Sequence, residues 1–415
     1  MTLSKIGRLI MALVATASLG LGMTACGGGT IGYMWVLGTY YNQISGYLID
    51  DYTGNLSGIP HSPFSSGGAN PVTVVVKPGG RFIFVVNAGT GATGAPGTAS
   101  FTSPGEGITV FSVGGAGILT YEATYSGRGV QPVWASLDSS GNFLYVLDKY
   151  APDYKTTGNG SITAFQIEGD TGRLTLVPNT AVLNAGIPQT FFEVGPNPIM
   201  NKFGAGGCMF SLSPNSIYPY AVNPSNGQLT VPTTGPYVVS GSNSLNSINT
   251  STGSAAGSYM YLTDGPGNQI FSLQSGGSAC SLTPITGSQQ TNLSGSANPV
   301  NSLTSTSGKF LYVLNQTNTG TTVNSNSSIS AFTIDPLGKL APLIDPGNNP
   351  YAVGSGPVCM VQDPTNQYIY ISNNTDSTVT GKRFDQIRGY LSNLQRGSVF
   401  PVTMKPTCLA VSGNV

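Results

Sequence analysis

Apolar and polar positions follow a pattern that recurs along the chain. Its clearest copy covers residues 356–373, where a proline opens a short apolar segment, a polar turn follows, and an aromatic-rich segment ends in Asn. Related copies occupy residues 71–87, 132–148 and 299–315. The second segment of each copy alternates aromatic and β-branched residues with a period of two, which is typical of a β-strand. Such self-similarity predicts a repeat architecture built from β-sheets.

Each repeat can be divided into four strands, named a to d in chain order. In one copy, strand c is predicted at residues 328–335 and strand d, which includes a tight Gly-containing turn, at 336–343. Four short antiparallel strands form one blade of a β-propeller, and stacked blades bury a continuous core. The fourth repeat is degenerate, with strand a expected at 188–193. In the fifth repeat, Ser244 replaces the proline that opens strand a.

The two ends of the folded chain complement each other. Residues 34–39 resemble a strand b that no strand a precedes, whereas residues 405–411 resemble a strand a that nothing follows. Pairing residues 406–411 with 34–39 completes a blade, closes the ring and removes open sheet edges. We therefore predict an all-β fold over residues 33–415. It is a seven-bladed β-propeller of four-stranded antiparallel blades, closed by pairing of the N- and C-terminal strands.

Residues 1–25 are predicted to lie outside the fold. Lys5 and Arg8 precede an apolar stretch at 9–21, a pattern typical of a signal peptide and too short for a membrane span. The residues that follow resemble the lipobox of bacterial lipoproteins, in which the cysteine, here Cys26, is lipidated and becomes the new N-terminus. The alternative is an ordinary secretory signal with an incidental cysteine. The resemblance implies an exported protein, anchored to the membrane through lipid on Cys26, with residues 26–32 as a short tether. No inner-membrane retention signal follows the cysteine, so we expect the outer membrane.

Composition and cysteine content narrow the function. Charged residues make up only 8% of the chain, with 16 basic and 16 acidic side chains, so no electrostatic footprint for nucleic acid is present. Export implies an oxidising compartment, and Cys208, Cys280, Cys359 and Cys408 would remain in the mature protein. Four cysteines allow three pairings. We favour Cys359–Cys408, because these cysteines occupy equivalent positions on neighbouring inner strands, and hold Cys208–Cys280 as the second candidate.

The proline-opened a strands, the Phe-Leu-Tyr-Val b strands and c strands such as 331–335 resemble those of a known family. This family is the seven-bladed propeller lactonases, related to bacterial 6-phosphogluconolactonase, together with the wider group with Tyr-Val-Thr-Asn repeats. The resemblance covers essentially the whole mature chain and implies a site in the central channel, where the family's a strands often read Pro-Arg-His. The equivalent positions here carry neither His nor Arg; they are Thr73, Trp134, Thr190, Asn246, Asn301, Cys359 and Cys408.

Candidate site residues are therefore the polar, aromatic and charged side chains expected near the channel. Glu193, on the predicted a strand of the fourth repeat, is the one candidate for a catalytic base, although such a carboxylate more often pairs with a basic neighbour. The expected ligand-binding residues are Arg128, Trp134, Thr190, Asn246, Asn301 and Lys405. No residue spacing predicts a metal site. Residues 89–94 match a dinucleotide-binding pattern, but no helix follows, so no cofactor is expected.

Strand alternation predicts that the longest loops gather on one face of the propeller. Residues 88–107, 149–160 and 316–326 form b–c connections on this face, whereas the a–b and c–d turns are short, with residues 198–207 as the exception. Such loops can form a recognition surface or can be tolerated insertions. We expect a binding or scaffold module for a small molecule, a glycan or a protein. The alternative is a lactone hydrolase with a rearranged site.

Overall fold

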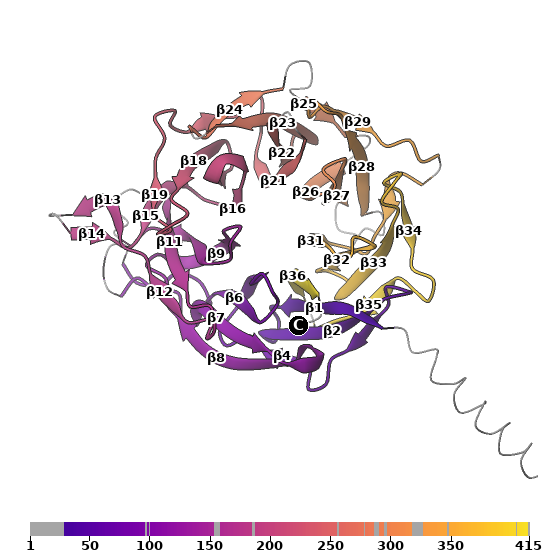
Figure 1. Cartoon of the computed structure of the whole chain (residues 1–415), viewed down its shortest axis with the longest axis horizontal. Coiled ribbons are helices and arrows are strands. Elements are labelled where there is room, and N and C mark those ends of the chain that lie inside the picture. The colour runs from indigo at the N-terminus through magenta and orange to yellow at the C-terminus, as the bar shows by residue number, and fades with distance from the viewer. Residues whose placement is uncertain are drawn as a thin grey trace, which may run out of the picture.

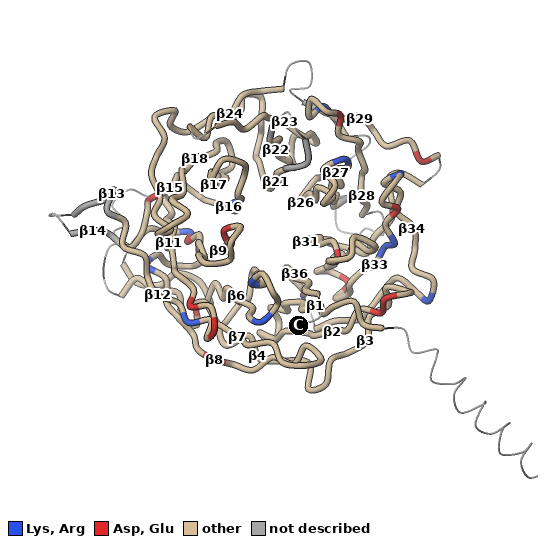
Figure 2. Tube along the Cα trace, viewed as in Figure 1, with Lys and Arg blue, Asp and Glu red and all other residues tan. Residues whose placement is uncertain are grey.

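Seven antiparallel sheets stand around a central axis like the blades of a propeller (Figure 1). This computed structural model describes residues 29–413, except for gaps at 96–97, 99, 153–157, 185–186, 255–256, 278, 286–289, 294–296, 318–326, 347 and 404. The predicted all-β, seven-bladed fold is confirmed. Charged residues are sparse and scattered along the chain (Figure 2).

Each blade is built from four strands that follow one another from the axis outward. The first blade consists of β36 (Pro406–Gly413), β1 (Thr30–Gly38), β2 (Gln43–Asp50) and β3 (Leu56–Gly58). The second contains β5 (Pro71–Val76), β6 (Phe82–Ala88), β7 (Glu106–Val113) and β8 (Leu119–Tyr125). The third contains β9 (Val130–Leu137), β10 (Phe143–Tyr150), β11 (Asn159–Ile167) and β12 (Leu174–Leu176). The fourth contains β16 (Met200–Phe203), β17 (Cys208–Ser213), β18 (Ser216–Val222) and β19 (Leu229–Thr230).

The remaining three blades repeat this order. The fifth consists of β21 (Leu245–Ser254), β22 (Gly257–Asp264), β23 (Gln269–Gly276) and β24 (Ser281–Pro284). The sixth contains β26 (Ala297–Thr304), β27 (Phe310–Thr317), β28 (Ser328–Ile334) and β29 (Leu340–Pro342). The seventh contains β31 (Pro357–Gln362), β32 (Tyr368–Asn373), β33 (Thr378–Phe384) and β34 (Leu391–Asn393).

Short additional elements decorate the rim and the turns. Six blades carry an extra outer strand on strand c: β4 (Phe64–Ser65), β15 (Phe192–Pro196), β20 (Tyr237–Val238), β25 (Gln290–Asn292), β30 (Tyr351–Ala352) and β35 (Val399–Pro401). A separate hairpin pairs β13 (Asn179–Asn184) with β14 (Ile187–Gln189). Two 3₁₀ turns, η1 (Gly115–Gly117) and η2 (Ala205–Gly207), lie in a c–d turn and an a–b turn.

The predicted closure of the ring is confirmed. Strand β36 pairs antiparallel with β1, with Met34 opposite Val411 and Val36 opposite Leu409. The last strand of the chain therefore forms the inner strand of the first blade, and β1 is paired on both sides, with β36 and with β2.

The hydrophobic core is divided into seven clusters, one at each interface between neighbouring blades. Strand b feeds two of them, because successive side chains of a strand point to opposite faces. In β6, Phe82, Phe84 and Val86 pack toward the third blade, whereas Ile83 and Val85 pack toward the first. The aromatic alternation seen in the sequence thus arises from burial on both faces of strand b.

The same joint recurs at six of the seven interfaces. The first aromatic residue of strand b lies against a glycine in the c–d turn of the next blade; the glycines are Gly54, Gly117, Gly172, Gly227, Gly338 and Gly389. Each has φ between +68° and +79°, and a Cβ there would come within 2.4–2.6 Å of the ring. Two residues further along strand b, Tyr145, Tyr261, Tyr312 and Tyr370 donate a hydrogen bond to the carbonyl of the same glycine, over 2.7–3.1 Å. Trp35 Nε1 does the same to Gly117 over 3.2 Å.

The interface between the fourth and fifth blades replaces this joint with a disulfide. Cys208 takes the place of the first aromatic residue of strand b, and Cys280, with φ of 50°, takes the place of the turn glycine. Their Cα atoms are 5.5 Å apart, and both residues are 1% exposed. The predicted Cys208–Cys280 pair is therefore confirmed. This disulfide connects the two blades at the position where a ring and a glycine are in contact at the other interfaces.

Two predicted inner strands are placed differently by the structure. In the fourth blade the expected strand a at residues 188–193 is wrong: the inner strand is β16, and the proline that precedes it is Pro198 rather than Pro188. Asn197, before this proline, has a positive φ, as do Asn70, Gln131, Gly356 and Lys405 before theirs. Residues 198–207 are consequently not a long a–b loop, because they contain the four residues of β16.

In the fifth blade the register is shifted by one residue. Leu245 lies opposite Asp264, in the way that Pro299 lies opposite Asn315 in the sixth blade. Leu245, not Ser244, therefore takes the place of the opening proline, and Ser247 rather than Asn246 takes the equivalent inner position. A shift of one residue turns every side chain of a strand to the other face.

We predict that Gly338→Ala destabilises the protein more than Gly235→Ala. Both glycines have a positive φ, but nothing lies within 4 Å of a Cβ at Gly235, whereas a Cβ at Gly338 meets the Tyr259 ring at 2.4 Å. The backbone strain common to both should cost roughly 1–2 kcal/mol. The clash should add about 1–3 kcal/mol for Gly338→Ala alone. Denaturant unfolding of both variants measures the difference, and equal losses would show that the joint contributes nothing.

Candidate functional site

The central channel holds a cavity of about 510 Å³ lined by all seven inner strands. These strands, β36, β5, β9, β16, β21, β26 and β31, follow one another around the axis (Figure 1). Cavities of roughly 300–1,000 Å³ are typical of small-molecule sites. The channel is therefore the place to compare with the predicted site residues.

Most of the channel wall is apolar or carries neutral polar groups. Asn249 Nδ2 donates to the Ser302 carbonyl over 2.7 Å, and Asn301 Nδ2 donates to the Val358 carbonyl over 3.3 Å. Gln362 Oε1 accepts the Thr306 amide over 3.2 Å, and its buried Nε2 has no partner among the described residues. Amides that keep spare donors and acceptors can bind the hydroxyl or carboxylate oxygens of a ligand.

Lys202 is the only titratable side chain among the described residues that line this cavity. It is the third residue of β16, and no carboxylate in the described part of the chain lies within ion-pair distance of its ammonium group. Burial lowers its pKa from the usual value of a lysine. A half-buried cation without an ion-pair partner favours an anionic ligand, because burial of a charge is costly unless another group compensates it.

Sequence reasoning missed Lys202 because it chose the wrong proline. The signal was present: Pro198-Ile199-Met200 has the same form as Pro132-Val133-Trp134, which opens the third blade. Lys202 stands four residues after Pro198, so the same alignment would have placed it in the channel.

Of the predicted ligand-binding residues, Trp134 and Asn301 line the cavity, and so do Thr73, Cys359 and Cys408 from the other predicted channel positions. Trp134 lies on β9, half-buried, and packs against the core clusters of three different interfaces. One of these contains Cys359 and Cys408, which also line the cavity. The indole therefore extends along the channel wall and narrows the space available to a ligand.

Asn246 lies outside the residues that line the cavity, because of the register shift of β21. Its Oδ1 accepts a hydrogen bond from the Thr263 hydroxyl over 2.9 Å. Its neighbour Ser247 is 1% exposed, with its hydroxyl 2.6 Å from that of the same Thr263. Both side chains connect strands of the fifth blade.

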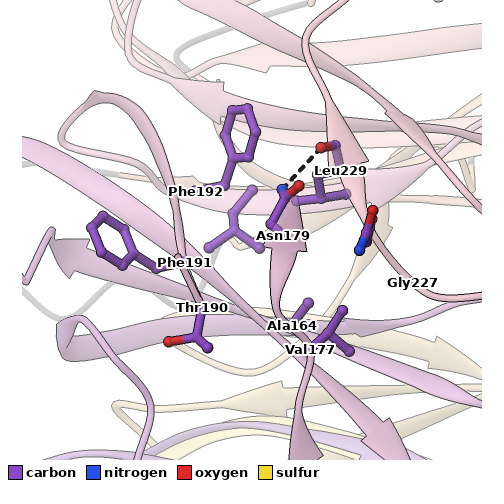
Figure 3. Close-up of a pocket in the computed structure, with 10 residues that line it drawn as sticks. Ala164, Val177, Asn179, Thr190, Phe191, Phe192, Gly227 and Leu229 are labelled. Carbon is purple, nitrogen blue, oxygen red and sulfur yellow. Dashed lines mark hydrogen bonds between the residues drawn. The ribbon is translucent and has the colours of Figure 1, made fainter. Parts of the chain in front are cut away.

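Thr190 and Glu193 are not on an inner strand. Thr190 lies beside a small outer cavity, together with Phe191, Phe192 and Asn179, whose Nδ2 donates to the Leu229 carbonyl over 2.9 Å (Figure 3). Glu193 lies on β15, which pairs with β11 as the outermost strand of the third blade, and its side chain is exposed. The predicted channel positions of both residues are wrong, so Glu193 has no route to act as a base there.

Arg128 and Lys405 lie on the connections that lead into β9 and β36, and both side chains are exposed. The Arg128 amide donates to Thr163 Oγ1 over 3.0 Å, and the Lys405 carbonyl accepts the Thr39 amide over 3.1 Å. Neither residue lines the cavity. The single histidine of the sequence, His61, is exposed with a φ of 65°.

The favoured disulfide is confirmed and forms part of the channel wall. Cys359 on β31 and Cys408 on β36 are bonded, with their Cα atoms 5.1 Å apart. The bond joins the inner strand of the seventh blade to that of the first. It therefore closes the ring covalently, beside the β36–β1 pairing that closes it through hydrogen bonds.

The most perturbed carboxyl group lies away from the channel cavity, at the end of β10. Asp148 is fully buried, and burial raises its pKa to about 7, with a further increase from nearby Glu106. Its Oδ2 accepts the Gly129 amide over 3.2 Å and the Thr163 hydroxyl over 3.0 Å. Glu106, whose pKa is also raised by burial, accepts the Gln131 amide over 2.6 Å. Both carboxyl groups thus hold the connection that leads into β9.

We predict that Asp148→Asn stabilises the protein at high pH. The equivalent residues in three other blades are Asn87, Asn315 and Asn373. Because the folded-state pKa of Asp148 is raised, its contribution to the free energy of unfolding is greatest below its unfolded pKa. This contribution falls as the pH rises from about 4 to about 7. The variant should abolish this fall and gain up to about 4 kcal/mol at pH 8, since one pKa unit corresponds to about 1.4 kcal/mol.

Urea unfolding of the Asp148→Asn variant and the unmodified protein at pH 5 and pH 8 measures the effect. Asp264→Asn is the matched control in the fifth blade, where the carboxylate accepts backbone amides of Asn243, Ser244 and Gly267 over 2.6–3.0 Å. That change should destabilise the protein. A loss of stability at pH 8 in Asp148→Asn would contradict the assigned cost of the buried carboxylate.

No protein-family model matches the sequence, and no curated protein matches it. Solved structures match the fold. A candidate 6-phosphogluconolactonase from Bacteroides uniformis has a TM-score of 0.68 at 16% identity, covering 92% of this chain and 99% of that one. The periplasmic gluconolactonase of Pseudomonas aeruginosa has a TM-score of 0.68 at 17% identity, covering 93% of this chain and 100% of that one. A protein from Lactobacillus plantarum has a TM-score of 0.67 at 16% identity, covering 92% of this chain and 100% of that one.

The chain is thus a seven-bladed β-propeller that shares the fold of lactonase propellers. At these identities the likeness is one of fold, and the chemistry of the channel has to be judged from its own residues. Among the residues that the structure describes, no group of His, Cys, Asp and Glu side chains could hold a metal ion. No helix within residues 29–413, gaps aside, has the length and apolar character needed to cross a membrane.

Proposed function

We propose that this propeller binds a small ligand that carries a carboxylate and hydroxyl groups in its central channel, without hydrolysing it. The observation that carries the proposal is Lys202, an unpaired and desolvated cation in a wall that otherwise offers amides, hydroxyls and apolar groups. The carboxylate would accept hydrogen bonds from the ammonium group. The ligand's hydroxyls would bind the amides of Asn249 and Asn301.

Binding without turnover follows from what lines the cavity. Lactone hydrolysis needs a group that activates water as well as donors that stabilise the oxyanion. Lys202 could serve as a cationic donor, but none of the described lining residues is a carboxylate or a histidine. A lactone hydrolase with a rearranged site is the alternative, and the fold shared with gluconolactonases supports it.

We predict that Lys202→Met weakens binding of gluconate, measured by isothermal titration calorimetry on the purified protein. Loss of a charge-assisted hydrogen bond of about 1.5–3 kcal/mol corresponds to a Kd that rises roughly 10- to 100-fold. Lys309→Met removes an exposed lysine and Glu193→Gln alters the outer rim, so both controls should bind like the unmodified protein. Equal binding by Lys202→Met would overturn the proposal.

A parallel assay with glucono-1,5-lactone separates binding from catalysis. We expect hydrolysis at the uncatalysed rate with the unmodified protein and with both Lys202→Met and Glu193→Gln. Turnover that disappears in Lys202→Met would establish the hydrolase instead, with the lysine in the reaction. Turnover that disappears in Glu193→Gln would place the chemistry at the outer rim.

We also propose that the protein is exported and held at the cell envelope, in the outer membrane, by lipid on Cys26. The lipobox resemblance supports the anchor, although Cys26 lies outside the described residues. Two disulfides support an oxidising compartment, and one structural neighbour is a periplasmic protein. Cys26→Ser should move the protein from the membrane fraction to the soluble fraction on cell fractionation, whereas Cys359→Ser should leave it in the membrane fraction. Retention of the Cys26→Ser protein in the outer membrane would refute the anchor.

A further inference from the structure

A second and larger cavity lies at the outer rim, between the sixth and seventh blades. Its volume is about 970 Å³, and it shares no lining residue with the channel. Its walls come from the outer strands β30, β33 and β34 and from the segments that flank them. The groove is thus separated from the channel by the inner strands of both blades.

The floor of this groove carries a buried cation. Lys382 on β33 is 7% exposed, and burial lowers its pKa. Its Nζ donates to Asn393 Oδ1 over 2.8 Å, and no carboxylate in the described ranges lies within ion-pair distance. An ammonium group has three donors, so two remain for a partner in the groove. A lysine is rarely buried without such partners, because an uncompensated charge is costly.

The walls carry hydrogen-bond acceptors. Asp345 accepts the Tyr351 hydroxyl over 2.8 Å and Asn348 Nδ2 over 3.0 Å, and Asp376 accepts the Ser355 amide. A carboxylate has about four acceptor positions, so both groups keep capacity for further donors. Two carboxylates beside one cation disfavour an anionic ligand and favour one that donates and accepts at many positions.

The groove also has apolar lining. Val399 lines it and is 61% exposed, although large aliphatic side chains are usually buried. The half-buried Tyr390 lines it as well and donates its hydroxyl to the Ile344 carbonyl over 3.0 Å. Side chains of this kind can pack against the C–H faces of a sugar ring.

We propose that the groove between the sixth and seventh blades binds a neutral oligosaccharide. Sugar hydroxyls would accept hydrogen bonds from Lys382 and donate them to Asp345 and Asp376. The ring faces would contact Tyr390 and Val399. This site is independent of the channel and gives the protein a second ligand, a glycan chain bound on the outside of the propeller.

The test uses the purified full chain and four probes: the hexamers of cellulose, amylose and chitin, and polygalacturonate as an anionic comparison. Calorimetry should detect binding of at least one neutral hexamer. Lys382→Met and Asp376→Asn should each raise its Kd, by about 10-fold or more for the lysine, the effect of one lost charge-assisted hydrogen bond. Lys309→Met, on the surface, and Lys202→Met, in the channel, should leave hexamer binding unchanged.

Several results would overturn the proposal. These are no binding of any neutral hexamer, equal binding by Lys382→Met and Asp376→Asn, tighter binding of polygalacturonate, or loss of hexamer binding in Lys202→Met, which would assign the sugar to the channel. Asp376 is exposed, so its variant should fold even if replacement of the buried lysine does not. Thermal unfolding of each variant identifies those that remain folded.

Discussion

The propeller depends on one contact between blades, in which an aromatic ring of strand b lies on a glycine of the next blade's c–d turn. The glycine is required twice over, since its positive φ disfavours a side chain and the ring occupies the space that a Cβ would need. In five blades the residue two positions after this aromatic ring on strand b is Tyr or Trp. Its hydroxyl or indole N–H donates a hydrogen bond to the glycine carbonyl, so a buried backbone group is satisfied within the same contact. Repeated around the ring, this joint sets how each blade is oriented on its neighbour.

One interface has a disulfide in place of this contact between ring and glycine. At the interface between the fourth and fifth blades, Cys208 and Cys280 occupy the positions of the ring and the glycine, and their disulfide connects the two blades. The second disulfide, Cys359–Cys408, connects inner strands at the point where the ring closes. One bond thus replaces a joint, and the other reinforces the closure that the pairing of β36 with β1 already provides.

Because strands b and the c–d turns hold the blades together, the inner strands are free to differ. They surround the axis, where at least two residues from each blade contribute to a common wall. This freedom permits Trp134 on one strand, Lys202 on the next and a disulfide on two others without disturbing the interfaces. The same holds at the outer rim, where strands c and d carry Lys382 and its neighbours. Both proposed sites are lined by residues other than the rings and glycines of the joints.

The sequence by itself determined the number of blades, the closure of the ring and the residues of most strands, because period-two alternation and turn glycines are local signals. It also favoured Cys359–Cys408, because these cysteines occupy equivalent positions on neighbouring inner strands, and it offered Cys208–Cys280 as the second candidate. It did not determine which proline opens the fourth blade or the register of the fifth. Pro188 and Pro198 are both locally acceptable, and Ser244 and Leu245 differ by one position. Only the tertiary structure decided these cases, because a strand's register is fixed by pairing across the sheet and burial against the next blade. Those two decisions moved Glu193, Thr190 and Asn246 out of the channel wall and placed Lys202 in it.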